Sequence, residues 1–141
     1  MNIVSDANQM DFLDALQTRL DRLQYWRAYI EKALKRGRSL VTFTEMVQSI
    51  ISGQRFLFDN GKSFAIVQLD QNPSGLGVYI YVAGGEYKPL CELEEIIVQF
   101  AKLMGAIRLS TLGRDGFLRR KRPNGWVPTH QTYFVKDLKE N

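Results

Sequence analysis

The chain has 141 residues and a mass of 16.2 kDa; 45% of its residues are hydrophobic and 24% are charged, as in one ordinary globular domain spanning residues 1–141. A single cysteine, Cys91, excludes an intrachain disulfide, and a single histidine, His130, leaves no cluster at zinc-ligand spacing, so we expect no metal site. The net charge is +4, but six basic residues and one acidic residue lie between residues 106 and 125, and the remaining residues sum to −1.

Two helices are predicted before the first strand. The first covers residues 9–36, because its apolar residues recur at spacings of three, four and seven. Gly37 is a plausible stop for this helix. The second would begin with Thr42 or Thr44 as its N-cap and end at Gly53. The stripe of the first helix consists of Leu13, Leu16, Leu20, Leu23, Ile30 and Leu34.

From Arg55 the hydrophobic period changes to two, which predicts three consecutive strands. Residues 55–59 and 63–71 flank an Asn-Gly turn, a pair that is typical of β-hairpins. A third strand is expected over residues 76–84. Together these strands would form an antiparallel meander.

The C-terminal part predicts a strand, helix and strand crossover. A helix over residues 91–105 has one apolar face, and a short strand over residues 106–113 follows it. Residues 115–122 form a short helix or irregular turn, and residues 126–138 a terminal strand in which Pro128 favours an edge position. The expected fold class is therefore α+β, with helices on both faces of the sheet.

This order of elements resembles the GNAT (Gcn5-related N-acetyltransferase) fold, in which two helices, a meander, a crossover helix and two closing strands follow one another. Seven short segments make the chain similar, more narrowly, to a set of small GNAT-like proteins: residues 43–47, 51–57, 82–85, 101–106, 113–117, 125–126 and 135–138. Those proteins belong to tailed bacteriophages and include the internal virion protein A type. The resemblance implies a virion or head-assembly protein.

In GNAT enzymes a loop after the long strand holds the acetyl-CoA pyrophosphate with successive backbone N–H groups and the start of the next helix. The resemblance makes Gly84 and Gly85 candidate contacts of a vestigial cofactor loop. No Arg or Gln precedes them as the family pattern requires, and Pro89 removes one donor. The sequence also predicts acidic residues at the helix start, where they would repel a pyrophosphate: Glu92, Glu94 and Glu95.

The sequence shows no clear general acid or general base for acetyl transfer. In many family members a tyrosine protonates the departing thiolate, and the matching position falls near Lys121, in a run without tyrosine. Tyr133 as donor and Glu86 or His130 as acceptor share no spacing that links them. We therefore assign no catalytic residue and no cofactor.

The sharpest charge feature is the arginine-rich stretch near the C-terminus. Arginine outnumbers lysine there, as expected where bidentate contact with phosphate or carboxylate matters, and a solvated basic face is the alternative. No recognition-helix pattern accompanies it, so base-specific recognition is not predicted. The candidate contacts for DNA or an acidic partner are Arg114, Arg119, Arg120, Lys121 and Arg122.

Three aromatic residues, Tyr25, Trp26 and Tyr29, crowd the first predicted helix beside its leucine stripe. Two interpretations stay open. The rings extend the packing surface of the helix, or they mark a face that binds a partner.

The favoured hypothesis is a non-enzymatic phage virion or head-assembly protein, located in the virion or the host cytoplasm. Its partners would be portal, capsid or internal core proteins and packaged DNA. The alternative is an acyl-CoA-dependent N-acetyltransferase using acetyl-CoA, and a third hypothesis is a cytosolic DNA-associated regulator. The sequence has no secretory signal and no membrane span, so we expect neither secretion nor a membrane partner.

Overall fold

The computed structural model describes residues 6–112, 125–129, 131–132 and 134–138. The chain divides into two units, Met1–Thr111 and Leu112–Asn141, and all helices and strands of the described residues lie in the first. The single domain over residues 1–141 stays a prediction. Within the described part of the chain, no helix is both long enough and apolar enough to cross a bilayer.

Three helices precede the strands, where the sequence predicted two: α1 (Asp6–Tyr25), α2 (Arg27–Arg36) and α3 (Phe43–Ile51). The predicted first helix is interrupted at Trp26, whose φ of −91° and ψ of 3° depart from helical values. The Trp26 ring packs against Phe64, with the ring centroids 4.8 Å apart. The interruption is therefore a consequence of burying the indole, which no local propensity encodes.

The start of α3 follows one of the two predicted possibilities. The Thr42 hydroxyl accepts the backbone N–H of Glu45 at 3.2 Å, and the Glu45 carboxylate accepts the backbone N–H of Thr42 at 3.3 Å. This reciprocal pair is a capping box, which satisfies two N–H groups that the helix itself leaves without partners. Thr42 is thus the N-cap, and α3 ends at Ile51, two residues before the predicted Gly53.

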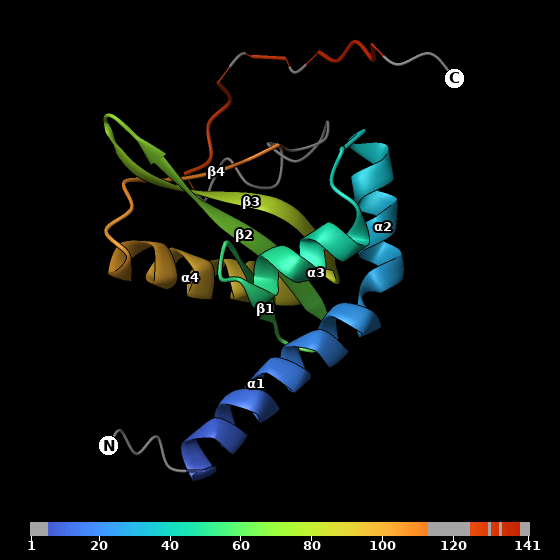
Figure 1. The fold of residues 1–141 in the computed structure, drawn as a ribbon. Helices are drawn as coiled ribbons and strands as arrows, with labels where there is room; N and C mark the ends of the chain where they lie inside the picture. Colours follow the sequence, from blue (N-terminus) through green and yellow to red (C-terminus); the bar gives the residue numbers. More distant parts are fainter. Residues whose placement is uncertain (1–5, 113–124, 130, 133, 139–141) are drawn as a thin grey trace. The chain divides into compact units, whose positions relative to one another are not determined.

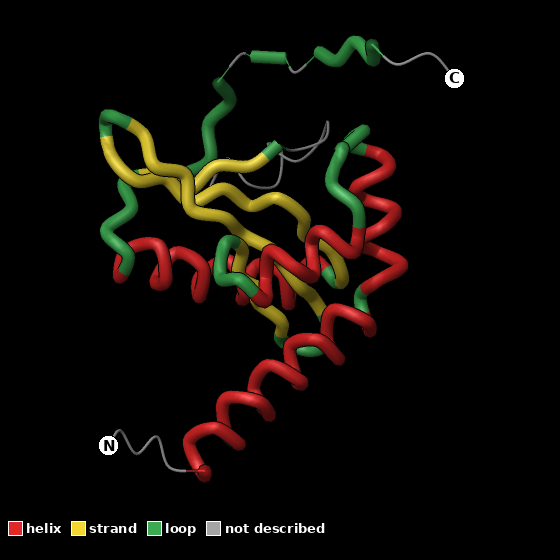
Figure 2. Tube along the Cα trace, viewed as in Figure 1, coloured by secondary structure: helices red, strands yellow, loops and turns green. Residues whose placement is uncertain are grey.

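The sheet has four strands in the order β1-β2-β3-β4 (Figures 1 and 2). The three antiparallel strands confirm the predicted meander, and β4 pairs with β3 in parallel after a crossover through α4. The elements are β1 (Arg55–Asp59), β2 (Ser63–Asn72), β3 (Gly75–Gly85), α4 (Tyr87–Leu103) and β4 (Arg108–Thr111). The expected α+β class and the crossover are confirmed.

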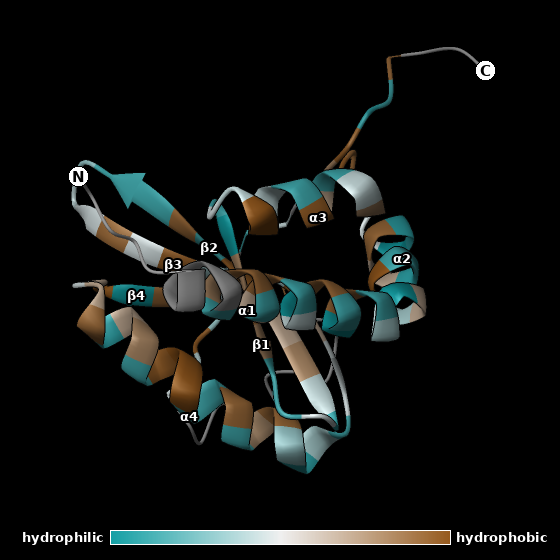
Figure 3. Ribbon diagram, turned by 60° about the horizontal axis from the view of Figure 1, so that its bottom comes forward, coloured by the Kyte–Doolittle hydropathy of each residue, from teal (hydrophilic) through white to brown (hydrophobic). Residues whose placement is uncertain are grey.

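Helices cover both faces of this sheet, so the unit has two hydrophobic cores (Figure 3). One core lies under α1, α2 and α3, and includes Leu23, Ile30 and Phe64. The other lies under α4, where Leu93 and Ile97 pack against strand residues of the opposite face. Burial of these apolar side chains is the main term that stabilises the three layers.

A β-bulge in β3 changes which residues face which core. Ile66 pairs with Val82 and Val67 pairs with Ile80, so Tyr81 is the extra residue. Before the bulge, Ile80 packs in the α4 core; after it, Val82 belongs to the core under α1–α3. The alternation of side chains along β3 is therefore broken at Tyr81.

The prediction of a terminal strand over residues 126–138 is wrong for the residues described there, which form no strand. Their apolar side chains are not buried: Val127 is 75% exposed and Phe134 is 85% exposed. Pro128 also lacks the N–H that a ladder requires. The short helix or turn predicted at residues 115–122 lies outside the described residues.

The carboxylate of Asp59, at the end of β1, connects the sheet to the helices. It accepts hydrogen bonds from the Arg22 guanidinium, from Trp26 Nε1 at 3.1 Å and from the Gly61 N–H at 2.6 Å. Burial by itself would raise the pKa of Asp59, but the bonds from Arg22, Gly61 and Trp26 outweigh it and lower the pKa below its usual value. The hydrogen bond to Asp59 in turn raises the pKa of Arg22.

Replacing Asp59 by alanine should lower the free energy of unfolding at pH 7 by about 2–3 kcal/mol, because Arg22 and Trp26 then lose a charged acceptor. Urea denaturation measures this, with Asp21→Ala on the exposed side of α1 as the control, expected to cost less than about 0.5 kcal/mol.

The same site predicts a pH dependence. Because the folded-state pKa of Asp59 lies below its unfolded value, its stabilisation is present above about pH 4 and is lost as the pH falls through the folded pKa. The stability difference between wild type and Asp59→Asn should therefore shrink on acidification below about pH 4. A difference that stays constant from pH 7 to pH 2 would contradict this account.

Candidate functional site

The predicted cofactor contacts, Gly84 and Gly85, lie in the last two positions of β3 and not in a loop. They pair with Phe64 and Ser63 of β2. Their backbone is thus part of the sheet, and α4 begins two residues after Gly85.

Both glycines lie where a side chain would meet the neighbouring strand. Gly85 has a φ of +105°, and a Cβ there would overlap the Lys62 carbonyl and lie 2.6 Å from Ser63 Cα. A Cβ on Gly84 would lie 3.0 Å from Phe64 Cε1. Close packing on β2 therefore requires both glycines, and contact with a coenzyme stays a prediction.

The start of α4 corrects the predicted position of the acidic residues. The helix begins at Tyr87, four residues before the expected start, and its first turn contains no acidic residue. Pro89 is accommodated inside this first turn, where its missing N–H would have had no acceptor in any case. The three glutamates lie further along the helix, so they do not neutralise its positive end: Glu92, Glu94 and Glu95.

Few backbone donors face an anion at this point. The Glu86 N–H bonds to the Lys62 carbonyl at 3.0 Å, and the Leu90 N–H bonds to the Glu86 carbonyl at 3.0 Å. An anion in front of the helix would meet the N–H groups of two first-turn residues, Tyr87 and Lys88, before Pro89. A cradle of successive N–H groups, such as a pyrophosphate requires, is not formed by the described residues of this turn.

β4 pairs with only part of β3. Their pairing runs from Gly77 and Arg108 to Ile80 and Thr111, and β4 ends there while β3 continues to Gly85. The Thr111 hydroxyl donates to the Ile80 carbonyl at 3.0 Å, at the last paired position. Within the described residues, the end of β3 beyond the bulge therefore has no strand beside it on the β4 side.

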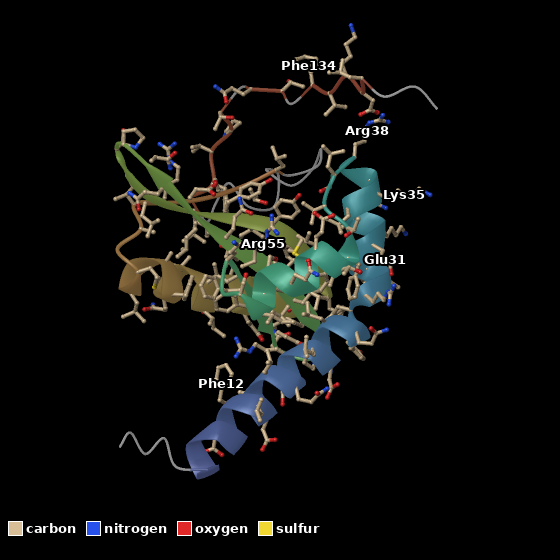
Figure 4. The ribbon with its side chains drawn as sticks, in the orientation of Figure 1. Phe12, Glu31, Lys35, Arg38, Arg55 and Phe134 are labelled. Atoms are coloured by element: carbon tan, nitrogen blue, oxygen red, sulfur yellow. The ribbon has the colours of Figure 1, made fainter. Side chains whose placement is uncertain are left out.

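A row of polar and aromatic side chains crosses the sheet near the same place. The Tyr81 hydroxyl lies 2.6 Å from Ser39 Oγ, and the guanidinium of Arg55, which is labelled in Figure 4, lies 4.8 Å from the centre of the Tyr81 ring. Arg55 Nε also donates to Gln68 Oε1 at 3.1 Å, and Gln68 in turn donates to Asp70 at 3.1 Å. Tyrosine and serine hydroxyls at this position can orient a polar ligand or donate a proton to it.

Sequence reasoning missed this row, although the sequence contains a signal for it. Tyr79 and Tyr81 are two residues apart in a strand, and their rings meet edge to face with centroids 5.9 Å apart. The candidate donor and acceptor that the sequence suggested, Tyr133 and His130, lie outside the described residues. So do the predicted DNA or partner contacts Arg114, Arg119, Arg120, Lys121 and Arg122.

No protein-family model matches this chain, and no curated protein sequence matches it. Solved structures do. A probable acetyltransferase has a TM-score of 0.62 and 12% identity, covering 86% of this chain and 95% of its own. The aminoglycoside N-acetyltransferase AAC(6')-Iy in complex with CoA has a TM-score of 0.60 and 10% identity, covering 84% and 90%.

A third structure is a predicted acetyltransferase with acetyl-CoA from Clostridium acetobutylicum. It has a TM-score of 0.54 and 11% identity, covering 67% of this chain and 71% of its own. At such identities the likeness concerns the fold. The described chain thus has the fold of the GNAT acetyltransferases, as its order of elements predicted.

The packing of Gly85 gives a testable prediction. Gly61 and Gly85 both have positive φ, at +88° and +105°, but nothing lies within 4 Å of a Cβ on Gly61. Gly61→Ala should therefore cost about 1 kcal/mol of unfolding free energy for its backbone conformation, whereas Gly85→Ala should cost about 3 kcal/mol or more. Equal losses in urea denaturation would show that contact with β2 does not constrain Gly85.

Proposed function

We propose that this chain is a non-enzymatic binding protein on a GNAT scaffold, acting as a virion or head-assembly protein of a tailed bacteriophage. Its partners are portal, capsid or internal core proteins and packaged DNA. The contacts are made by the arginine-rich stretch: Arg114, Arg119, Arg120, Lys121 and Arg122. The shared fold is compatible with a non-enzymatic role, because one scaffold serves enzymes and binding proteins alike.

The observation that carries the non-enzymatic half of the proposal is the direct passage from β3 into α4. Gly85 is packed against Ser63, and the Glu86 N–H is bonded to the Lys62 carbonyl at 3.0 Å. The backbone that would hold a pyrophosphate is thereby occupied by the start of β2. The phage setting rests on the sequence segments that resemble the small GNAT-like phage proteins, such as residues 43–47 and 51–57.

A second candidate function is an acyl-CoA-dependent N-acetyltransferase. Two observations favour it: the first turn of α4 carries no acidic residue, and the pairing of β3 with β4 ends at Ile80 and Thr111. A ligand beside the stretch of β3 that β4 does not pair could bond to the edge of β3, with a phosphate at the start of α4. Two of the solved structures that share this fold hold CoA or acetyl-CoA.

Calorimetric titration with acetyl-CoA up to millimolar concentrations separates the two functions. The non-enzymatic proposal expects no saturable heat, because the backbone just before α4 is already packed on and bonded to the start of β2. Saturable binding that Lys88→Glu weakens, and that the matched change Lys102→Glu at the other end of α4 leaves intact, would contradict the non-enzymatic proposal and favour the acetyltransferase candidate. Lys88 and Lys102 are both exposed, so neither change should unfold the chain.

The basic contacts are tested by reversing three charges together: Arg119→Glu, Arg120→Glu and Arg122→Glu. Duplex DNA binding, measured by fluorescence anisotropy at physiological salt, should fall at least tenfold, since fewer neutralised phosphates also release fewer counterions. The control reverses Lys62, Lys102 and Lys136, which gives the same net charge. Binding that survives the arginine reversal would contradict the proposed role of this stretch.

A further inference from the structure

A second basic surface lies on α2, within the described residues. Ile30 and Leu34 are buried and define the inner side of this helix. At 3.6 residues per turn, Lys32, Lys35 and Arg36 then lie on the outer side, where all three are exposed. Figure 4 shows Lys35 projecting from the side of α2 away from the sheet.

Two tyrosines continue this surface toward α1. Tyr25 and Tyr29 are 61% and 56% exposed, although both rings contact the buried Trp26 edge to face, with centroids 4.9 and 5.3 Å away. The Arg22 guanidinium lies 4.2 Å from the centre of the Tyr25 ring. The rings are thus held in place by the core while most of their area faces solvent.

The basic residues and the tyrosines lie along one side of the segment formed by the end of α1 and by α2. Tyr25, Tyr29, Lys32 and Arg36 follow one another at spacings of four, three and four residues. The helical hydrogen bonds continue through the interruption, since the Trp26 N–H bonds to the Arg22 carbonyl at 3.1 Å and the Ile30 N–H to the Trp26 carbonyl at 3.0 Å. We name Tyr25, Tyr29, Lys32, Lys35 and Arg36 the tyrosine–lysine face.

This face is electrostatically positive. Residues 25–38 contain four basic residues besides Arg27, and one acidic residue, Glu31. The carboxylate of Glu31 is bonded to Arg27 at 2.7 Å, so it does not neutralise the lysines. Phosphate groups would therefore be attracted along α2.

We propose that the tyrosine–lysine face binds single-stranded nucleic acid. Lys32, Lys35 and Arg36 contact the phosphates, and unpaired bases stack on Tyr25 and Tyr29. The exposed rings select a single strand over a duplex or an acidic polypeptide, because a base offers them a flat surface only when it is unpaired. Tyr29 and Arg36 lie about 10 Å apart along the helix, which matches about three nucleotides, and Tyr25 adds one more.

This inference goes beyond the proposed function, since it requires neither the C-terminal arginines nor a virion. The test uses the full-length protein and a fluorescein-labelled oligothymidylate of about 20 nucleotides, with anisotropy recorded from 50 to 300 mM salt. Wild type should bind, and Lys32→Gln, Lys35→Gln and Arg36→Gln together should weaken binding at least tenfold. The slope of log affinity against log salt should fall by about 2, because each neutralised phosphate of a single strand contributes about 0.7 to it.

A matched variant has the same net charge: Lys62→Gln, Lys88→Gln and Lys102→Gln, all exposed, should change the affinity less than twofold. Tyr25→Leu and Tyr29→Leu keep apolar contact with Trp26 but remove the flat ring. Each should weaken binding of the single strand about fivefold or more and leave duplex binding unchanged.

Three results would overturn the inference. The first is no binding of the oligothymidylate by wild type at 50 mM salt, and the second is an equal loss of affinity in the α2 triple variant and in the matched variant at positions 62, 88 and 102. The third is an equal loss of affinity for single strand and duplex in the tyrosine variants. The variant with reversed arginines at positions 119, 120 and 122 should retain oligothymidylate binding. If this arginine variant loses oligothymidylate binding entirely while the variant with glutamine at positions 32, 35 and 36 retains it, the C-terminal stretch is the site and the tyrosine–lysine face is not.

Discussion

The carboxylate of Asp59 joins two parts of the fold that are distant in sequence. Arg22 and Trp26 approach it from the junction of α1 and α2, and the Gly61 N–H approaches it from the turn between β1 and β2. One partly buried charge with several donors is stable, whereas any one donor without it would be left unsatisfied. The position of Trp26 against Phe64, and hence the course of α2 over the sheet, depends on this acceptor.

The bulge at Tyr81 divides β3 into two parts with different roles. Val78 and Ile80 serve the core under α4, while Val82 and the packed Gly84 serve the core under the N-terminal helices. The polar row around Tyr81 and Arg55 lies at this change of face, next to the last paired position of β4. The bulge therefore makes room for polar side chains without opening either core to water.

Local signals predicted the elements that are governed by local physics. The period of two predicted the meander, the threonines Thr42 and Thr44 were the two predicted N-caps of α3, of which the structure uses Thr42, and the order of elements predicted the fold class. The break at Trp26 and the change of face at Tyr81 arise from packing between distant segments, which periodicity cannot register. The predicted start of α4 lay four residues too late, and Pro89 is accommodated in the first helical turn. The candidate site was less predictable than the fold. Outside residues 106–125 the net charge is −1, because acidic residues elsewhere in the chain cancel the positive charge of α2. This total therefore gave no sign that α2 is basic.

The tight passage from β3 to α4 fixes the path of the backbone between these two elements. Gly85 and Glu86 are both held against the start of β2, and Tyr87 already belongs to the helix. Exchanging one side chain for another leaves the path of this backbone unchanged, so substitutions there cannot create a row of outward N–H groups. That would take inserted residues, so the length of this junction, more than its composition, sets how many N–H groups it can present.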